Sequence, residues 1–148
     1  VLKQWDEIKA TEQPKKKRVL EGIPTGPALD RAQKVGSRCG KVGFDWPGWE
    51  GSFEKVEEEV REVKAAILDN DPAHIHEEIG DLLFAIVNVA RKLGVDAENA
   101  LVDATAKFTR RFEKVEDALA ERGKTPQQSD LAEMDALWND AKKSVARK

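Results

Sequence analysis

Several residue types are scarce in this sequence, and each scarcity excludes a class of protein or site. There is one cysteine, Cys39, so an intrachain disulfide and a cysteine-based zinc site are both excluded. We expect Cys39 to be a small core residue. His74 and His76 are the only histidines, too few for the repeated Glu-x-x-His pattern of a di-iron helical bundle. Tyrosine is absent and aromatic residues make up only 6% of the chain, which disfavours β-sandwiches and barrels.

A net charge and long apolar runs are also missing. The 25 Lys and Arg residues nearly balance the 28 Asp and Glu residues, which leaves a formal charge of -3 and no basic field to hold a nucleic-acid backbone. No apolar run approaches the roughly 18 residues of a membrane-spanning helix, and residues 1–20 are too polar for a secretion signal. We therefore expect a soluble, cytoplasmic protein without a nucleic-acid or membrane partner.

Apolar residues recur at helical spacing along most of the chain, and no segment alternates with a period of two. Cap residues mark the helix ends: Ser52 and Asp71 are suited to helix starts, and Gly94 and Gly123 to helix ends. The pattern predicts an all-α, four-helix-bundle-like fold with four main helices and a short C-terminal one. The predicted helices span about 28–39, 52–68, 72–93, 97–122 and 131–145.

The first 26 residues differ in character from the rest. They combine a basic run at 15–18 with prolines and glycines that interrupt helices. The basic run is not interleaved with aromatic residues, which favours a solvated linker over a nucleic-acid patch. We expect residues 1–26 to be an arm or inter-domain linker and 27–148 to be the domain. Since the sequence starts at Val1 rather than at methionine, an excised or processed piece is the expectation.

Each long helix carries an apolar stripe that we expect to be buried. The stripes comprise Phe53, Val56, Val60, Val63 and Ile67; Ile75, Ile79, Leu82, Ile86, Val89 and Leu93; and Leu101, Thr105, Phe108, Phe112, Val115 and Leu119. The aromatic loop at 43–49 has two interpretations: a plug in the core, which we favour, or a pocket for a base.

Four acidic residues lie beside these stripes rather than on the solvated backs of their helices. Glu59 and Glu62, and likewise Glu78 and Asp81, lie about 70° and 130° from their stripe centres on an ideal helical wheel. If the two helices form an antiparallel hairpin, Glu59 lies at the height of Asp81 and Glu62 at the height of Glu78. The pattern therefore predicts four clustered carboxylates.

Clustered carboxylates repel one another unless a cation neutralises them. Carboxylate oxygens are preferred ligands of Mg²⁺, which commonly also binds substrate phosphates. We therefore predict that Glu59, Glu62, Glu78 and Asp81 hold Mg²⁺, with Mn²⁺ as an alternative. The other interpretation is four solvated acids neutralised by Lys and Arg. Lys107 and Arg111, near the third stripe, are suited to a phosphate group or to a salt bridge with a neighbouring Glu.

The motifs in this sequence resemble those of all-α nucleoside triphosphate pyrophosphohydrolases, and most closely the C-terminal domain of bacterial MazG proteins. The resemblance covers residue 27 to the end. It rests on EEVRE at 58–62, EIGDLLF at 78–84, VGFDW at 42–46 and KFTRRF at 107–112.

This resemblance implies a dimeric hydrolase that converts a nucleoside triphosphate to its monophosphate and pyrophosphate. By position, it implies that the four acids are catalytic and bind the metal. The implied substrate-binding residues are Lys55, Glu58, His74, Lys107, Arg111 and Trp138. Among these, Trp138 stacks on the base or simply packs in the core, and His74 departs from the lysine expected there. The alternatives are a non-catalytic dimerisation module and a narrow dUTP or dCTP pyrophosphatase.

Overall fold

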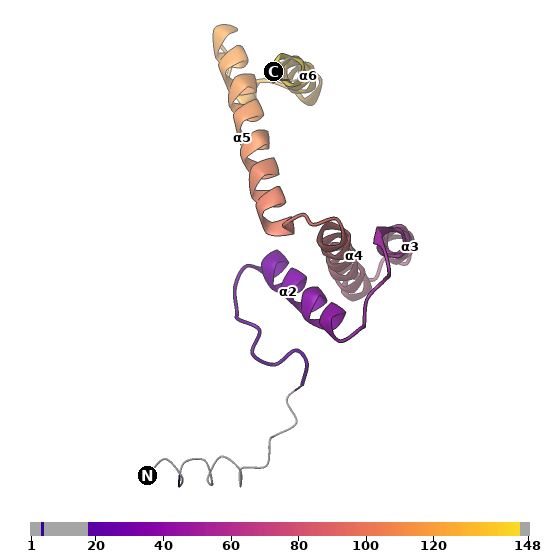
Figure 1. Cartoon of the computed structure of the whole chain (residues 1–148). Coiled ribbons are helices and arrows are strands. Elements are labelled where there is room, and N and C mark those ends of the chain that lie inside the picture. Colours follow the sequence, from indigo (N-terminus) through magenta and orange to yellow (C-terminus); the bar gives the residue numbers. More distant parts are fainter. Residues whose placement is uncertain (1–3, 5–17, 146–148) are drawn as a thin grey trace. The chain divides into compact units, whose positions relative to one another are not determined.

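The computed structural model describes Gln4 and residues 18–145, and within this part of the chain it contains helices and no strands. The predicted all-α class is confirmed (Figure 1). The proposed arm at 1–26 lies mostly outside the described residues, so its boundary with the domain stays a prediction. The helices are α2 (Ala28–Lys41), α3 (Trp49–Leu68), α4 (Pro72–Lys92), α5 (Ala97–Glu121), α6 (Leu131–Val145) and the short 3₁₀ helix η1 (Pro126–Gln128). Of the described helices, none is both long and apolar enough to cross a membrane.

The described residues form two compact units that divide between Ala97 and Glu98. The first unit contains α2, α3 and α4, in which α4 packs against both α3 and α2. A short turn joins α3 to α4, and Asn70 in this turn has a positive φ of 51°. The carboxylate of Asp71 then accepts hydrogen bonds from the backbone N–H groups of Ala73 (3.1 Å) and His74 (3.4 Å), as predicted for the cap of α4.

The start of α3 differs from the prediction. The helix begins at Trp49, after Gly48, so the prediction that Ser52 caps it is wrong. Ser52 lies inside the first turns and is fully buried, and its hydroxyl donates a hydrogen bond to the carbonyl of Trp49 at 2.6 Å. A serine that satisfies its hydroxyl on a preceding carbonyl can remain within a helix. The aromatic loop is consequently shorter than expected.

The face of α3 that packs within the first unit is not its apolar stripe. Its buried residues are Ser52, Glu59 and Ala66, which are spaced seven apart and so share one face. Val60 is 51% exposed and Ile67 equally so, and therefore the prediction that this stripe is buried is wrong for the single chain. The small residues Ser52 and Ala66 let α3 approach α4 closely, whereas the bulky stripe faces away. Other exposed members of the predicted stripes are Phe53, Ile79, Ile86, Leu93, Leu101 and Phe108.

The second unit consists of α5, η1 and α6. Its core contains Val115, Leu119 and Leu137, with Phe112 and Met134 packed against them. The C-terminal half of the predicted α5 stripe is thus buried as expected. Gly123, with a φ of +69°, follows the end of α5, in agreement with the predicted stop.

Candidate functional site

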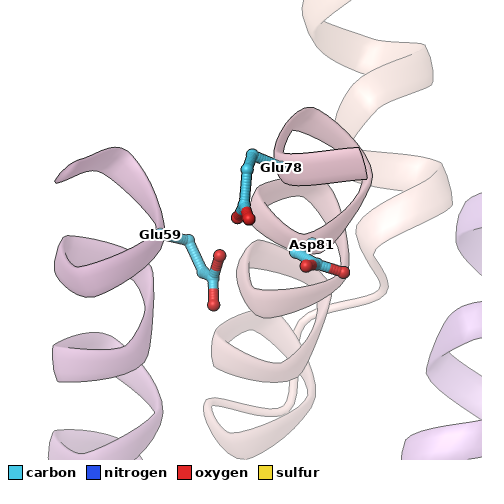
Figure 2. Close-up of side chains that lie close together, drawn as sticks. All are labelled: Glu59, Glu78 and Asp81. Carbon is cyan, nitrogen blue, oxygen red and sulfur yellow. The ribbon is translucent and has the colours of Figure 1, made fainter. Parts of the chain in front are cut away.

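Three carboxylates meet between α3 and α4. Figure 2 shows Glu59 extending from α3 toward Glu78 and Asp81 on α4. One ligand oxygen from each residue lies within 4.8 Å of the others. We refer to Glu59, Glu78 and Asp81 as the acidic group. Glu59 lies on the packed face of α3, while Glu78 and Asp81 are three residues apart and therefore neighbours on α4.

Glu59 is the most buried member of this group. It is 6% exposed, and its Oε2 is buried without a hydrogen-bond partner. Its other oxygen, Oε1, pairs with Nζ of Lys55 at 3.0 Å. A buried carboxylate oxygen without a partner carries a desolvation cost that a bound cation would remove.

The surroundings of Glu78 act on its pKa in opposite directions. Desolvation and the neighbouring carboxylate of Glu59 raise the pKa of Glu78, whereas its contact with His74 lowers it. The Nε2 of His74 lies 3.2 Å from Oε1 of Glu78. The charge of Asp81 also raises the pKa of Glu78. The acidic group thus carries more negative charge than the nearby side chains neutralise.

The chemistry of this donor set fits a hard divalent cation. All the group's ligand atoms are carboxylate oxygens, which Mg²⁺ and Mn²⁺ accept and which softer metals do not select. The unpartnered Oε2 of Glu59 is a specific observation in favour of this fit. Three protein carboxylates would hold such an ion and leave coordination positions for water and substrate oxygens.

A pocket of about 300 Å³ adjoins the acidic group. Its walls combine charged and apolar side chains: Trp46, Lys55, Glu59, Asp81, Phe84, Ala85 and Asn88. We call it the α3/α4 pocket. Its volume matches the lower range of small-molecule sites. One part is therefore suited to a cation and the anionic groups that the cation binds, and the other part to a flat, partly apolar moiety.

The residues that line this pocket, except Trp46, lie in a stretch of the chain that matches a known family. Residues 50–116, which include the whole acidic group, match the sequence model of the MazG nucleotide pyrophosphohydrolase domain. This stretch is similar to the MazG domain family. The resemblance predicted from the sequence motifs is therefore confirmed.

Similar proteins support the same family. The chain is 45% identical over 142 residues to the nucleoside triphosphate pyrophosphohydrolase/pyrophosphatase MazG of Thermotoga maritima, covering 95% of this chain and 54% of that protein. It is 43% identical over 150 residues to the nucleoside triphosphate pyrophosphohydrolase of Escherichia coli K12, covering 97% of this chain and 56% of that protein. The chain thus spans about half the length of these relatives.

Other predicted site residues lie on α3, beside Glu59. Glu62 is exposed on α3 and is not part of the group. Its position, three residues after Glu59, carries it further from the packed face. Glu58 is also exposed, and its Oε1 pairs with Nζ of Lys55 at 3.3 Å. Lys55 therefore balances two glutamates while it lines the pocket.

The remaining predicted residues lie in the second unit. Lys107 and Arg111 line a small cavity of about 80 Å³ on α5, together with Arg110 and Lys114. The Nε of Arg111 is buried without a hydrogen-bond partner. Its guanidinium carbon lies 5.9 Å from the ring centre of Trp138, within cation–π range. This concentration of cations is suited to an anionic ligand.

Trp138 packs against the core of the second unit, and its ring centre lies 4.7 Å from that of Phe108. It is partly exposed, so the same side chain packs in the core and offers a ring surface on which a ligand could stack.

Sequence reasoning missed part of the pocket wall. Phe84 and Asn88 were not among the predicted site residues, although they follow Asp81 at intervals of three and seven and so share its face of α4. This spacing from Asp81 is the feature of the sequence that indicates them as pocket residues. The prediction of an aromatic core plug is wrong for Phe44, which is 80% exposed. Trp46, in contrast, is half-buried and lines the pocket.

Proposed function

We propose that this chain hydrolyses nucleoside triphosphates to nucleoside monophosphates and pyrophosphate with the help of Mg²⁺. The observation that carries the proposal is the acidic group, in which a buried oxygen of Glu59 has no partner. The match to the MazG nucleotide pyrophosphohydrolase domain supports it. The similar proteins from T. maritima and E. coli, both named nucleoside triphosphate pyrophosphohydrolases, support it as well.

Glu59, Glu78 and Asp81 would hold the ion, and we retain Glu62 as a fourth candidate ligand. When bound, Mg²⁺ supplies charge neutralisation of the phosphate oxygens and acidification of a bound water. A carboxylate of this set that does not hold the ion would be available to accept a proton from a water molecule. Lys55, beside Glu59 on the pocket wall, is placed to contact a phosphate oxygen.

The residues outside the acidic group have supporting roles in this proposal. His74 orients Glu78 through their 3.2 Å contact, and Glu58 orients Lys55. The cations Lys107 and Arg111 bind phosphate groups, an assignment supported by the unpartnered Nε of Arg111. That Trp138 stacks on the base stays a prediction from the sequence, since its ring packs against Phe108 and the core of the second unit. Cytoplasmic location stays a prediction from the sequence.

We further infer that the functional form is a homodimer. The stripe of α3 leaves Val60 and Ile67 about half exposed, and α4 adds Ile79, Leu83 and Ile86. Rows of large exposed side chains on neighbouring helices are uncommon on a monomer's surface and mark an interface. Sedimentation equilibrium should give twice the chain mass for the wild type. A charged substitution, Ile67→Lys, should shift the protein toward the monomer, and Glu57→Lys on the same helix is the control.

The test of the activity is a panel of nucleoside triphosphates incubated with the protein and Mg²⁺, with the products separated by ion-exchange chromatography. The proposal expects monophosphate and pyrophosphate in equal amounts and no activity in EDTA. Diphosphate with inorganic phosphate would indicate a different reaction. A complete absence of products, with no rise in melting temperature on adding Mg²⁺ and a non-hydrolysable analogue, would favour a non-catalytic helical module.

A further inference from the structure

The wall of the α3/α4 pocket formed by Trp46 and Asn88 is held in place by a network centred on Arg91. Arg91 does not line the pocket. Its two terminal nitrogens donate parallel hydrogen bonds of 2.8 Å to the two carboxylate oxygens of Asp45. Its Nε donates to Oδ1 of Asn88 at 3.4 Å. One guanidinium therefore joins the loop before α3 to the C-terminal turns of α4.

The loop residue next to Asp45 is Trp46, and its backbone is fixed on both sides. Its N–H donates to Oδ1 of Asp45 at 2.9 Å, and its carbonyl accepts from Nζ of Lys92 at 2.7 Å. Lys92 also pairs with Asp45 at 3.2 Å. The side chains of Asp45, Arg91 and Lys92 are each less than a fifth exposed, so water screens these ion pairs less than those on the open surface. The orientation of Trp46 thus depends on charges outside the pocket.

Two glycines of α2 provide the space that this network occupies. A Cβ atom on Gly36 would lie 2.6 Å from Oδ1 of Asn88 and 2.7 Å from Nε of Arg91. A Cβ atom on Gly40 would lie 3.0 Å from Oδ2 of Asp45. Because the two glycines are four residues apart, they share one face of α2. A side chain at Gly36 would displace the Arg91–Asn88 hydrogen bond without itself lining the pocket.

A third glycine fits the ring of Trp46. A Cβ atom on Gly51, in the first turn of α3, would overlap Cδ1 of that ring. The indole therefore rests directly on the backbone of α3 while it lines the pocket. A flat aromatic surface and a buried amide, Asn88 at 7% exposure, are together suited to a planar heterocycle with hydrogen-bonding edges.

We propose that Arg91 is a positioning residue that fixes Trp46 and Asn88 as the subsite for the nucleobase, and so sets how well the protein distinguishes one base from another. The proposal rests on the nucleotide chemistry proposed above, because it assigns the part of the pocket that the phosphates and metal do not need. In the described part of the chain, no hydrogen bond or ion pair joins the acidic group to the Arg91 network, so the two can be perturbed separately.

The test compares Arg91→Lys, Asn88→Ala and Gly36→Ala with the wild type, and uses Ser37→Ala on the exposed side of α2 as the control. Steady-state kinetics are measured on four nucleoside triphosphates that differ only in the base. Each of the first three variants should raise KM by about tenfold or more and narrow the KM differences among bases, while kcat changes by less than about threefold. The rise in melting temperature on adding Mg²⁺ alone should equal that of the wild type.

Different failures have different meanings. A variant that loses kcat and the Mg²⁺-induced stabilisation together would show a general structural role and overturn the proposal. Unchanged base preference in all three variants would overturn it too. If the wild type hydrolyses none of the four nucleotides, the proposed activity fails. In that case the inference is judged by Mg²⁺-dependent binding of non-hydrolysable analogues, where equal affinity for wild type and variants, or no binding at all, overturns it.

Discussion

Glu59 and Glu78 extend toward each other from neighbouring helices until ligand oxygens of their carboxylates lie within 4.8 Å. Like charges at this distance cost free energy, and the cost appears as a raised pKa of Glu78, which is caused by desolvation and by Glu59. Without enough local cations, this repulsion lowers the free energy of unfolding, and a bound cation would remove the loss. The pair is therefore the physical basis of the proposed metal centre.

The first prediction follows from this repulsion. A raised pKa means that the folded state holds its proton more tightly than the unfolded state, so ionisation of Glu78 destabilises the metal-free fold. The penalty is absent well below the ordinary Glu pKa of about 4.3 and complete above the raised value. Glu78→Gln should therefore raise the metal-free melting temperature at pH 7.5 and leave it unchanged near pH 3.5. Scanning calorimetry in EDTA measures both.

The matched control is Glu77→Gln, an exposed glutamate on the same helix, which should change neither value. Adding Mg²⁺ should stabilise the wild type and not Glu78→Gln. A variant with a lower melting temperature than wild type at pH 7.5 in EDTA would mean that Glu78 is a stabilising partner and not a strained ligand.

The sequence predicted the helices and three members of the acidic group, since these depend on local spacing. The Asp71 cap, the Gly94 and Gly123 turns and the face shared by Glu78 and Asp81 all follow from patterns within a few residues. Which face of α3 packs inward did not follow. Hydrophobicity favoured Val60, whereas close approach to α4 requires the small residues Ser52 and Ala66.

The pocket wall formed by Trp46 and Asn88 could not be predicted from the periodicity of apolar residues either. It depends on Arg91 joining two segments separated by 46 positions in sequence, and on the space left by Gly36. Neither a lone Asp-Trp pair nor a single glycine predicts such a contact. This part of the pocket is formed by residues that are distant in the sequence and close together in the fold, so local propensity does not predict it.

The second prediction concerns the core of the second unit. Leu119 is fully buried among Val115, Leu137 and Met134. Leu119→Ala leaves a cavity and should lower the free energy of unfolding by about 2–5 kcal/mol. Leu131→Ala is the control, because Leu131 is 80% exposed and its truncation should cost about 0.5 kcal/mol or less. Urea unfolding followed by circular dichroism provides the comparison, and similar losses from the two variants would contradict the assigned core.

The third prediction is a pH dependence in the same unit. The hydroxyl of Ser129, followed by the guanidinium of Arg122 and the ammonium of Lys124, lowers the pKa of Glu133 to about 2. Since this folded value lies below the unfolded one, the stabilisation is present above about pH 4.5 and is lost as the pH falls toward 2. Glu133→Gln should therefore be less stable than wild type at pH 7, and the difference should shrink as the pH falls from 4.5 to 2.

Glu116→Gln on α5 provides the control, since Glu116 is exposed and should give the same stability as wild type across this range. Denaturant midpoints measured at five values of pH from 2 to 7 would give the profile. A constant difference between Glu133→Gln and wild type at every pH would show that the charge of Glu133 is not responsible.

The fourth prediction distinguishes the residues proposed to hold the metal from an exposed glutamate that is not proposed to bind it. Glu59→Gln and Asp81→Asn each remove one charged ligand from the acidic group and should lower kcat/KM by at least about 100-fold. Glu54→Gln, an exposed residue on α3, should retain wild-type activity. Glu62→Gln tests the fourth candidate ligand, and we expect its pyrophosphate release to be lost as well. Far-ultraviolet circular dichroism should show unchanged helicity in all four variants.

The most direct measurement is the quantity of pyrophosphate and monophosphate released from a nucleoside triphosphate by wild type and Asp81→Asn side by side, with Mg²⁺ present and then removed by EDTA. We predict equal amounts of the two products from wild type with Mg²⁺, and neither product from the variant or from the sample in EDTA. Undiminished release by Asp81→Asn, or by wild type without the ion, would contradict a metal centre at Glu59, Glu78 and Asp81.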